Sequence, residues 1–162
     1  MERIHAFKYE IDDKDRQIMR VLFNDGRMSI AEISKRTSIR RDSVARRLKR
    51  LVEEKIITTF VPIIEPSALG LPNVAILLLR LKAKDEHEKN TFQMKLISND
   101  YIVHISKILG KYDYYCSILY KNMTHLNEII EEIKNYVPNI IDEFEIYQGV
   151  EDPKFEDMRN LL

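Results

Sequence analysis

Apolar residues recur at helical spacing in successive segments of the first 55 residues. The first segment follows Asp12, a residue type that caps helix N-termini, and stops before Asn24-Asp25-Gly26. Its apolar stripe comprises Ile11, Ile18, Met19, Leu22 and Phe23. The second segment starts at the capping box Ser29-Ile30-Ala31-Glu32 and ends near Arg36. The pattern therefore predicts two helices ahead of a short turn at residues 37–39.

A third helix is predicted to follow this turn and to continue to about Glu54. Its apolar face comprises Val44, Leu48, Leu51 and Val52. The opposite face is polar and mostly cationic, and comprises Asp42, Ser43, Arg46, Lys49 and Arg50. Two short helices joined by a tight turn, the second of them basic on its solvent face, are typical of a helix-turn-helix that fits the DNA major groove.

The periodicity changes after Lys55. The β-branched residues 56–61 predict a strand, and Pro62, Pro66 and Gly70 mark a linker. The elements that follow alternate as strand, helix, strand, strand, helix and strand, over residues 74–81, 86–98, 102–109, 112–120, 124–136 and 140–147. This order is that of a ferredoxin-like βαββαβ domain, so the predicted fold class is α+β.

The segment Val74–Leu79 is apolar on both faces of its predicted strand. Helices of a ferredoxin-like domain cover only one face of the sheet, so the other face needs a cover. A homodimer that packs sheet against sheet would supply it. The alternative is that the chain's own linker or tail covers this face.

Positive and negative residues are distributed unevenly along the chain, although its formal net charge is +0. Residues 1–55 carry 15 Lys and Arg against 10 Asp and Glu, whereas residues 56–162 carry 11 against 16. The basic half is therefore the candidate for binding a polyanion. With Cys116 as the single cysteine, no intrachain disulfide forms. The N-terminus lacks the apolar core of a signal peptide and no apolar run is long enough to span a bilayer, so we expect a cytoplasmic protein without membrane contact.

Three motifs resemble those of the Lrp/AsnC, or feast/famine, transcription regulators. IDDKDRQIMRVLFNDGRMSIAEISKRT is similar to the first two helices of that family. DSVARRLKRLVEEKIITTFVPIIEPSALG resembles its recognition helix, hinge strand and linker, and Gly110-Lys111-Tyr112-Asp113 resembles the turn of its ligand-sensing domain. The resemblance implies a winged-type helix-turn-helix domain at residues 1–55, a hinge strand and linker at 56–70, a ferredoxin-like sensing and dimerisation (RAM) domain at 71–150, and a tail at 151–162.

The sequence also departs from the family pattern. Ser38 and Lys55 stand where the family usually has glycine, at the turn and at the end of the recognition helix. Arg40-Arg41 replaces a usual Ser-Pro helix start, which removes an N-cap and adds two cations at the groove-facing end. Leu109 stands where a Ser or Thr is common in the sensing turn. We expect the fold to be unaffected and the base preference to differ.

The resemblance implies a sequence-specific regulator that binds double-stranded DNA. By helix position, we expect Arg41, Asp42, Ser43 and Arg46 to reach base edges, where each good pair contributes about 1–3 kcal/mol of discrimination. Arg40 adds charge at the same end. The remaining cations are expected to hold phosphates, and they are Lys35, Arg36, Arg47, Lys49 and Arg50. The alternative is a solvated basic face on which Arg47 binds an acid of the first helix.

The same resemblance implies an assembly that starts from a homodimer and extends to a tetramer or octamer, and a small effector such as an amino acid. The candidate effector site consists of Leu109, Gly110, Lys111, Tyr112 and Asp113. A glycine would let the backbone approach an α-carboxylate, and Asp113 could pair with an ammonium group. The alternative is a tight turn between two strands, in which the Asp caps the turn.

Two further function classes stay open. Sirohaem decarboxylases share this architecture, so an enzyme is the first alternative, and an effector-independent architectural DNA-binding protein is the second. The four histidines, His5, His87, His104 and His125, are scattered and show no metal-ligand spacing. There is also no phosphate-binding glycine loop, so we expect no catalytic residue, no metal and no cofactor.

Overall fold

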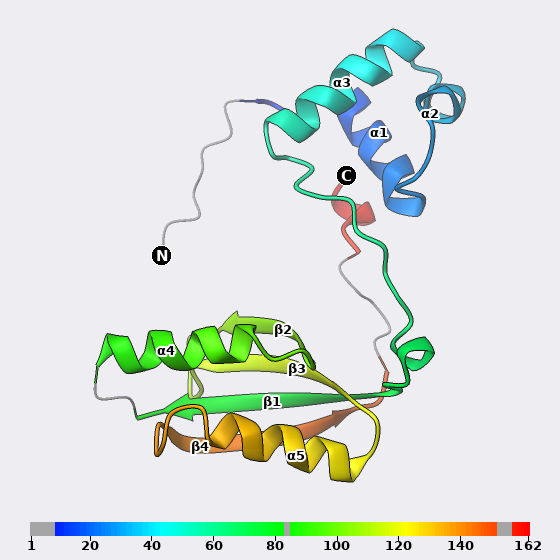
Figure 1. Ribbon diagram of the computed structural model, residues 1–162. Coiled ribbons are helices and arrows are strands. Elements are labelled where there is room, and N and C mark those ends of the chain that lie inside the picture. The colour runs from blue at the N-terminus through cyan, green and yellow to red at the C-terminus, as the bar shows by residue number, and fades with distance from the viewer. Residues whose placement is uncertain (1–8, 83–84, 152–156) are drawn as a thin grey trace. The chain divides into compact units, whose positions relative to one another are not determined.

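The computed structural model describes residues 9–82, 85–151 and 157–162 (Figure 1). These residues form two compact units. The first unit contains residues 9–62 together with 157–162, and the second contains residues 63–82 and 85–151. None of the helices within these described ranges is both long and apolar enough to cross a membrane.

The first unit contains three helices, which are α1 (Asp13–Asn24), α2 (Ile30–Thr37) and α3 (Arg41–Glu53). The predicted N-cap at Asp12 and the predicted capping box at Ser29 are both confirmed, and Asp12 forms a capping box as well. The side chain of Asp12 accepts a hydrogen bond from the Asp15 amide, and Ser29 does the same for Glu32. Because each cap satisfies amides that have no partner inside the helix, it fixes where the helix begins.

The core of the first unit lies between the three helices. Ile18, Ile33, Val44 and Leu51 are completely buried there. The buried face of each helix is narrower than the predicted apolar stripe. Phe23 and Val52, which were predicted to belong to these stripes, are 41% and 45% exposed. A unit of three short helices covers only the centre of each apolar stripe, so the flanking positions stay in contact with water.

The expectation of a hinge strand at residues 56–61 is wrong, because no strand forms in this segment. The amides of Ile56 and Ile57 instead both donate to the carbonyl of Leu51, at 2.9 and 3.0 Å, and so close the end of α3. A strand needs a hydrogen-bonding neighbour, and among the described residues none lies beside Phe60 or Val61. The helix-turn-helix prediction is confirmed, but its wing is absent from the described residues.

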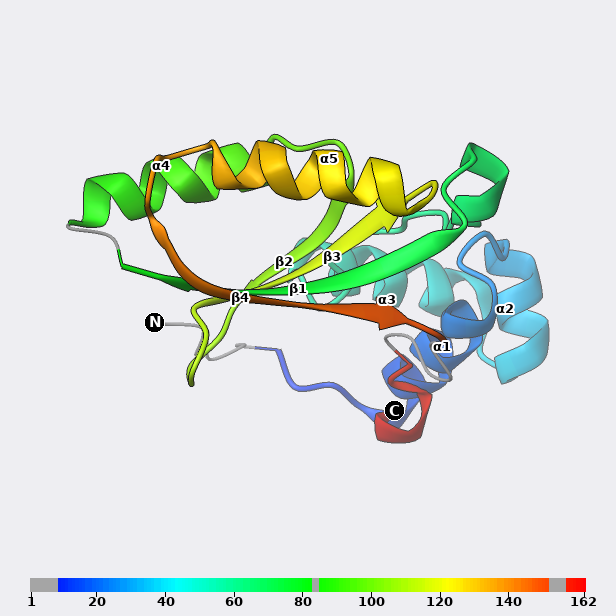
Figure 2. The same ribbon diagram turned by 90° about the horizontal axis from the view of Figure 1, so that it is seen from below.

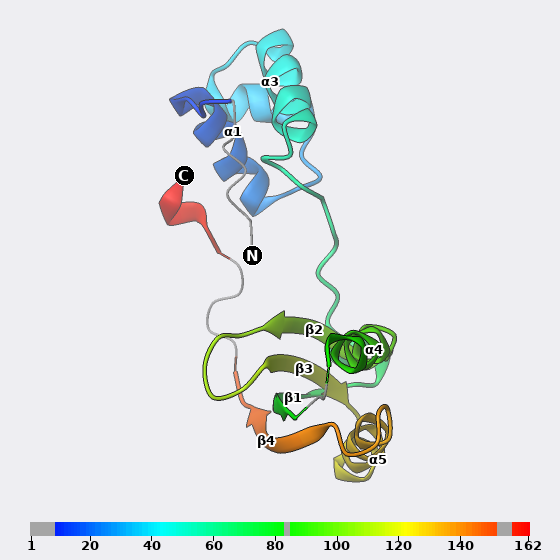
Figure 3. The same ribbon diagram turned by 90° about the vertical axis from the view of Figure 1, so that its left-hand side faces the viewer.

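The second unit has the predicted ferredoxin-like order. Its strands are β1 (Asn73–Leu81), β2 (Ile102–Lys107), β3 (Tyr114–Tyr120) and β4 (Ile141–Gly149), and its helices are α4 (Glu86–Ile97) and α5 (Met123–Lys134). The sheet is antiparallel with the order β2-β3-β1-β4. Both helices lie on the same face of the sheet (Figures 2 and 3). A short 3-10 helix, η1 (Pro66–Leu69), precedes the first strand.

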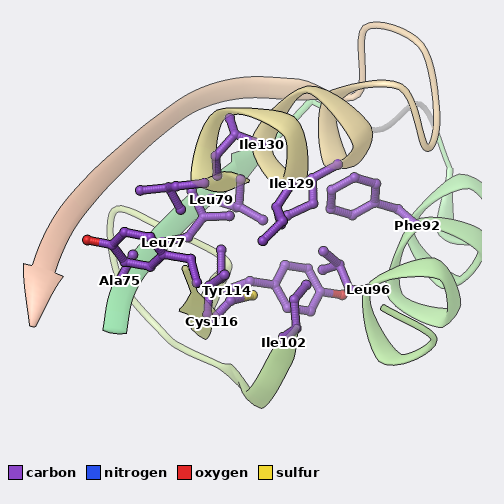
Figure 4. Packing of buried hydrophobic residues seen from close by; sticks show 14 of the residues in the cluster. Ala75, Leu77, Leu79, Phe92, Leu96, Ile102, Tyr114, Cys116, Ile129 and Ile130 are labelled. Carbon is purple, nitrogen blue, oxygen red and sulfur yellow. The ribbon is translucent and has the colours of Figure 1, made fainter. Parts of the chain in front are cut away.

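The core of the second unit lies between this face of the sheet and the two helices (Figure 4). Alternate residues of β1 point into it, among them Ala75, Leu77 and Leu79. Phe92 and Ile129 meet them from α4 and α5. This two-residue period is the reason why one face of β1 is buried while the other is only partly covered.

Neither α4 nor α5 lies on the opposite face of the sheet. On β1, Ile76 pairs with Ser117 of β3 and Tyr147 of β4, and paired residues share a face. Val74, Ile76 and Leu78 are only half-buried. The sequence-based expectation of an apolar second face is therefore met within the described residues.

The described tail ends in a short 3-10 helix, η2 (Arg159–Leu161). The spacing of Phe155, Met158 and Leu162 in the sequence predicts a short amphipathic helix with these three side chains inward. Leu162 does pack against the core of the first unit, whereas Met158 is 49% exposed because η2 has only a single turn. Phe155 lies outside the described residues.

Candidate nucleic-acid interface

The turn between α2 and α3 presents its polar groups outward. Ser38 adopts a left-handed conformation, with φ 58°, and reverses the chain between the helices. Arg40 is the N-cap of α3 but makes no side-chain cap hydrogen bond. The first amides of α3 therefore lack a side-chain partner, and they add a partial positive charge to the cations at this end.

The first two turns of α3 carry the side chains that were expected to read bases. Arg41, Asp42 and Arg46 are exposed, and Ser43 is half-buried. In the part of the chain that the structure describes, Arg40, Arg41 and Arg46 form no ion pair. These guanidinium groups are thus open to a ligand, whereas the apolar face of the same helix is buried at Val44.

Arg47 differs from its neighbours. Its Nη1 atom lies 2.8 Å from carboxylate oxygens of both Asp12 and Asp15 on the first helix. The hydrogen bond to Asp15 raises the pKa of Arg47. Its side chain is only 19% exposed, so this cation connects α3 to α1. Of the two interpretations of Arg47, the geometry supports the structural one and not phosphate binding.

Four other cations lie around the exposed face of α3. Lys35 and Arg36 occupy the last turn of α2 and are exposed. Lys49 lies 3.6 Å from Glu53 in an exposed pair, which costs little to separate. The guanidinium carbon of Arg50 lies 4.1 Å from the ring centroid of Tyr9, a cation–π contact that leaves its N–H groups available.

A polar depression next to the turn contains residues that the sequence did not single out. Lys14 and Gln17 of α1 line it, together with Thr37, Ser38, Ile39, Arg40 and Ser43. The depression brings the exposed face of α1 next to the start of α3. The helical period places Lys14 and Gln17 on one face, since they are three residues apart, but only the packing of α1 shows that this face borders the turn.

The second candidate site is the turn between β2 and β3. Leu109 is fully exposed, and apart from Gly110 itself and its two chain neighbours no described residue comes within 4 Å of the position that a Cβ of Gly110 would occupy. The ammonium group of Lys111 donates to Glu143 and, at 2.9 Å, to the hydroxyl of Tyr112. The contact with Glu143 raises the pKa of Lys111 and lowers that of Glu143.

Asp113 has a backbone role in this turn. Its Oδ2 atom accepts a hydrogen bond from the Leu81 amide at 2.7 Å, and its own amide donates to the Leu79 carbonyl at 2.8 Å. The carbonyl of Asp113 accepts from Ile108 at 2.9 Å. These bonds explain why β2 ends at Lys107 and β3 begins at Tyr114, so that both strands are shorter than predicted. They favour the alternative in which Asp113 fixes the turn.

The histidines that the structure describes have different neighbours. His104 contacts Ser106 and Tyr115, while His125 accepts from the Lys121 amide and packs edge-on to Tyr101. His5 lies outside the described residues. Among the described residues, no group of three or more His, Cys, Asp or Glu is arranged to hold a metal ion.

The exposed cations of a helix-turn-helix and a separate ferredoxin-like unit together define a DNA-binding regulator. An AsnC-type helix-turn-helix domain model matches residues 11–52. The transcriptional regulator FL11 of Pyrococcus furiosus is 32% identical over 123 residues, which cover 76% of this chain and 80% of FL11. Ptr1 of Methanocaldococcus jannaschii is 37% identical over 123 residues, covering 75% of this chain and 80% of Ptr1.

Solved structures show the same fold. The Neisseria meningitidis transcriptional regulator NMB0573, solved in complex with L-Met, has a TM-score of 0.83 at 18% identity, over 94% of this chain and all of that one. AsnC of Escherichia coli has a TM-score of 0.80 at 21% identity, over 93% and 99%. The chain belongs to the Lrp/AsnC family of DNA-binding transcription regulators.

Proposed function

We propose that this regulator reads its operator with the first two turns of α3. The observation that carries the proposal is the exposure of Arg41 and Arg46 without an ion pair among the described residues, on a helix whose third arginine, Arg47, is held by α1. An arginine without an internal partner is free to form a bidentate pair with guanine, and Asp42 can accept from cytosine. A half-site with G·C pairs under this helix is therefore expected.

The phosphate contacts are assigned to the rim of this surface. Lys35 and Arg36 lie on α2, Lys49 and Arg50 lie on the later turns of α3, and Lys14 and Arg40 line the depression beside the N-terminus of α3. Each neutralised phosphate releases condensed counterions, so affinity falls as the salt concentration rises. Because its proposed target is duplex DNA, we expect the protein to act in the cytoplasm.

A gel shift over a salt series, on operators obtained by selection, tests these assignments. Arg46→Ala and Arg41→Ala should each cost about 1–3 kcal/mol on the selected site and relax base preference. Arg36→Ala should instead weaken binding to all sequences and lower the salt slope by about one. Lys121→Ala, an exposed cation between β3 and α5, is the control and should change neither. Unchanged binding by both Arg41→Ala and Arg46→Ala would overturn the proposal.

We also propose a homodimer formed through the face of the sheet opposite α4 and α5, with tetramers or octamers built from it. Ile76 and Leu78 are half-buried on that face, and a two-fold partner would remove them from water. A lysine at position 76 would place a charge in this contact. Ile76→Lys should therefore sediment as a smaller species than wild type, and Thr124→Lys on the exposed side of α5 should not.

The effector proposal is supported by the NMB0573 complex, in which a protein of the same fold binds L-Met. The candidate segment here is Leu109–Asp113, in which Gly110 is exposed and the ammonium group of Lys111 donates to Glu143. A free amino acid would have to bind two assembly states unequally in order to regulate. Sedimentation and thermal unfolding with each amino acid, L-methionine included, would detect this difference.

We propose no catalytic role. A tetrapyrrole decarboxylase needs histidine or arginine groups that converge on its substrate, and a shifted absorption band of added sirohaem would reveal such binding. The architectural alternative predicts instead that no amino acid changes DNA binding or sedimentation.

A further inference from the structure

The C-terminal segment 157–162 packs on α1, from which it is separated by most of the chain. Arg16 of α1 donates through Nη1 to the carbonyl of Leu161 at 3.3 Å, and Arg20 donates to the Leu162 carbonyl oxygen. In the other direction, Arg159 donates through Nη1 to Oδ1 of Asn24 at 3.1 Å. The C-terminal end accordingly lies beside α1 in Figures 1 and 2.

The contact also has an apolar part. Leu162 is half-buried and packs against the core of the first unit, whereas Leu161 is 75% exposed. Asp157 holds Arg159 through hydrogen bonds of 2.7 and 2.9 Å, so the guanidinium group is oriented before it meets Asn24. Residues 157–162 therefore contact the first unit through one leucine side chain and three hydrogen bonds to α1.

Because residues 157–162 follow the second unit in the chain and pack on the first, their contact with α1 makes a second connection between the two units. From Gly149, the last residue of β4, to Asp157 the chain advances by eight residues, which span at most roughly 28 Å. From Ile57, whose amide is bound to the end of α3, to Asn73 at the start of β1 it advances by sixteen, which span at most roughly 56 Å. While the tail is docked, the shorter connection limits the separation of the units.

We propose that residues 158–162 act as a strap on α1 that limits how far the helix-turn-helix unit can move from the sheet unit. Release of the strap leaves only the longer connection. If the protein binds DNA as a dimer, as proposed above, a docked strap restricts the spacing between half-sites that the two recognition helices reach together. The strap on α1 does not itself depend on DNA binding.

The strap is weak enough to be released by a single change. Its hydrogen bonds are all at exposed positions, where water competes for the donors, and Leu162 is its only apolar side chain packed on the core. A strap of this strength populates docked and released states, and anything that binds α1 or the tail shifts their ratio.

Leu162→Ser removes the packed side chain, and Leu161→Ser is the matched control, since it makes the same change one position earlier on an exposed side chain. Spin labels at Glu54→Cys and Asn127→Cys report the distance between the units in chains diluted with excess unlabelled protein. Cys116 needs no replacement, because burial raises the pKa of its thiol to about 12 and shields it from the label.

We expect a narrow distance distribution for wild type and Leu161→Ser, and a broader one extending to longer distances for Leu162→Ser. Arg20→Ala, which removes a donor on the α1 side, should broaden it likewise. Circular dichroism must show that the helices are retained in each variant. Equal distance distributions in all four proteins would overturn the strap proposal. Equal broadening of the distance distribution by Leu161→Ser and Leu162→Ser would also overturn it.

A second measurement connects the strap to DNA. On paired half-sites at a series of spacings, wild type should prefer one spacing several-fold, and Leu162→Ser should lower that preference without weakening binding to a single half-site. Absence of any DNA binding would contradict the proposed function alone, because the distance measurement contains no DNA. A spacing preference that is unchanged in Leu162→Ser would contradict the strap alone.

Discussion

The Nη1 atom of Arg47 lies 2.8 Å from Oδ1 of Asp15, a carboxylate that is completely buried on α1. Asp15 also accepts a hydrogen bond from the hydroxyl of Tyr9 and one from the Asp12 amide at 3.2 Å. Burial and the bond to Asp15 raise the pKa of Tyr9. One arginine of the basic helix is therefore part of the framework that orients that helix.

Loss of this ion pair should destabilise the helix-turn-helix unit. Arg47→Ala would leave the buried Asp15 carboxylate without its cation, and we expect a loss of about 3 kcal/mol in the free energy of unfolding. A urea titration followed through the amide signals of Ile18 and Ile33, both in the core of this unit, would measure it. Arg46→Ala, one position earlier and exposed, is the control and should change stability by less than about 0.5 kcal/mol.

A double-mutant cycle separates the pair from its surroundings. Arg47→Met and Asp15→Leu are made singly and together, and the double variant should be less destabilised than the sum of the two single changes, since it leaves no unpaired charge buried. A double variant as unstable as the sum of the two single changes would show that the two residues do not interact.

Replacement of Ser38 or Lys55 by glycine should stabilise the helix-turn-helix unit. Ser38 and Lys55 adopt φ values of 58° and 57°, the left-handed region that costs an L-residue roughly 1–2 kcal/mol. Glycine removes that cost but gives the unfolded chain more freedom, so Ser38→Gly and Lys55→Gly should each stabilise by about 0.5 kcal/mol. Thermal unfolding would measure the gain. Ser38→Ala and Lys55→Ala keep a Cβ and should show none.

Acid should weaken the same unit. The Asp15 amide, followed by Arg47, lowers the pKa of Asp12, and hydrogen bonds from Ser29 lower that of Glu32. A depressed carboxyl pKa stabilises the fold above the unfolded pKa, here 3.8 for Asp12, and this stability disappears as the pH falls through the folded value. Urea midpoints measured from about pH 5 to about pH 3 should therefore decrease.

Asp12→Asn is the matched control for this acid dependence. Asparagine is still a good N-cap but carries no titrating group at position 12. The variant should lose less stability on acidification than wild type does, although it starts from a lower value at neutral pH. An identical pH dependence in both proteins would exclude Asp12 as a source of it.

Asp113→Asn distinguishes a structural role of this residue from an effector role. The amide side chain retains an oxygen that can accept from the Leu81 amide, so the turn between β2 and β3 should stay intact. The negative charge is lost, which would weaken an effector that pairs its ammonium group with Asp113. We expect unchanged thermal stability, and any response of assembly to an amino acid should require a higher concentration. Asp113→Ala, which lacks the acceptor, should lower stability by about 1 kcal/mol.

Local signals predicted the elements of this protein well. The capping boxes at Asp12 and Ser29 mark where α1 and α2 begin, because a cap is formed by residues within four positions of each other. The continuous apolar run Val74–Leu79 likewise indicated a strand with two apolar faces, but only the structure shows which of them packs against α4 and α5. Residues 56–61 have the same β-branched composition, but the strand prediction for them was wrong, since composition does not supply a neighbouring strand.

The sequence by itself determined the helices, the succession of strands and helices along the second unit and the basic character of α3, because these follow from propensity, periodicity and charge along neighbouring residues. Only the tertiary structure decided which cations have partners within the described chain. Arg46 and Arg47 are adjacent and chemically identical, yet one faces solvent and the other faces Asp15, thirty-two residues away. The docking of Leu162 on the core of the first unit is likewise a long-range contact, which no local pattern specifies.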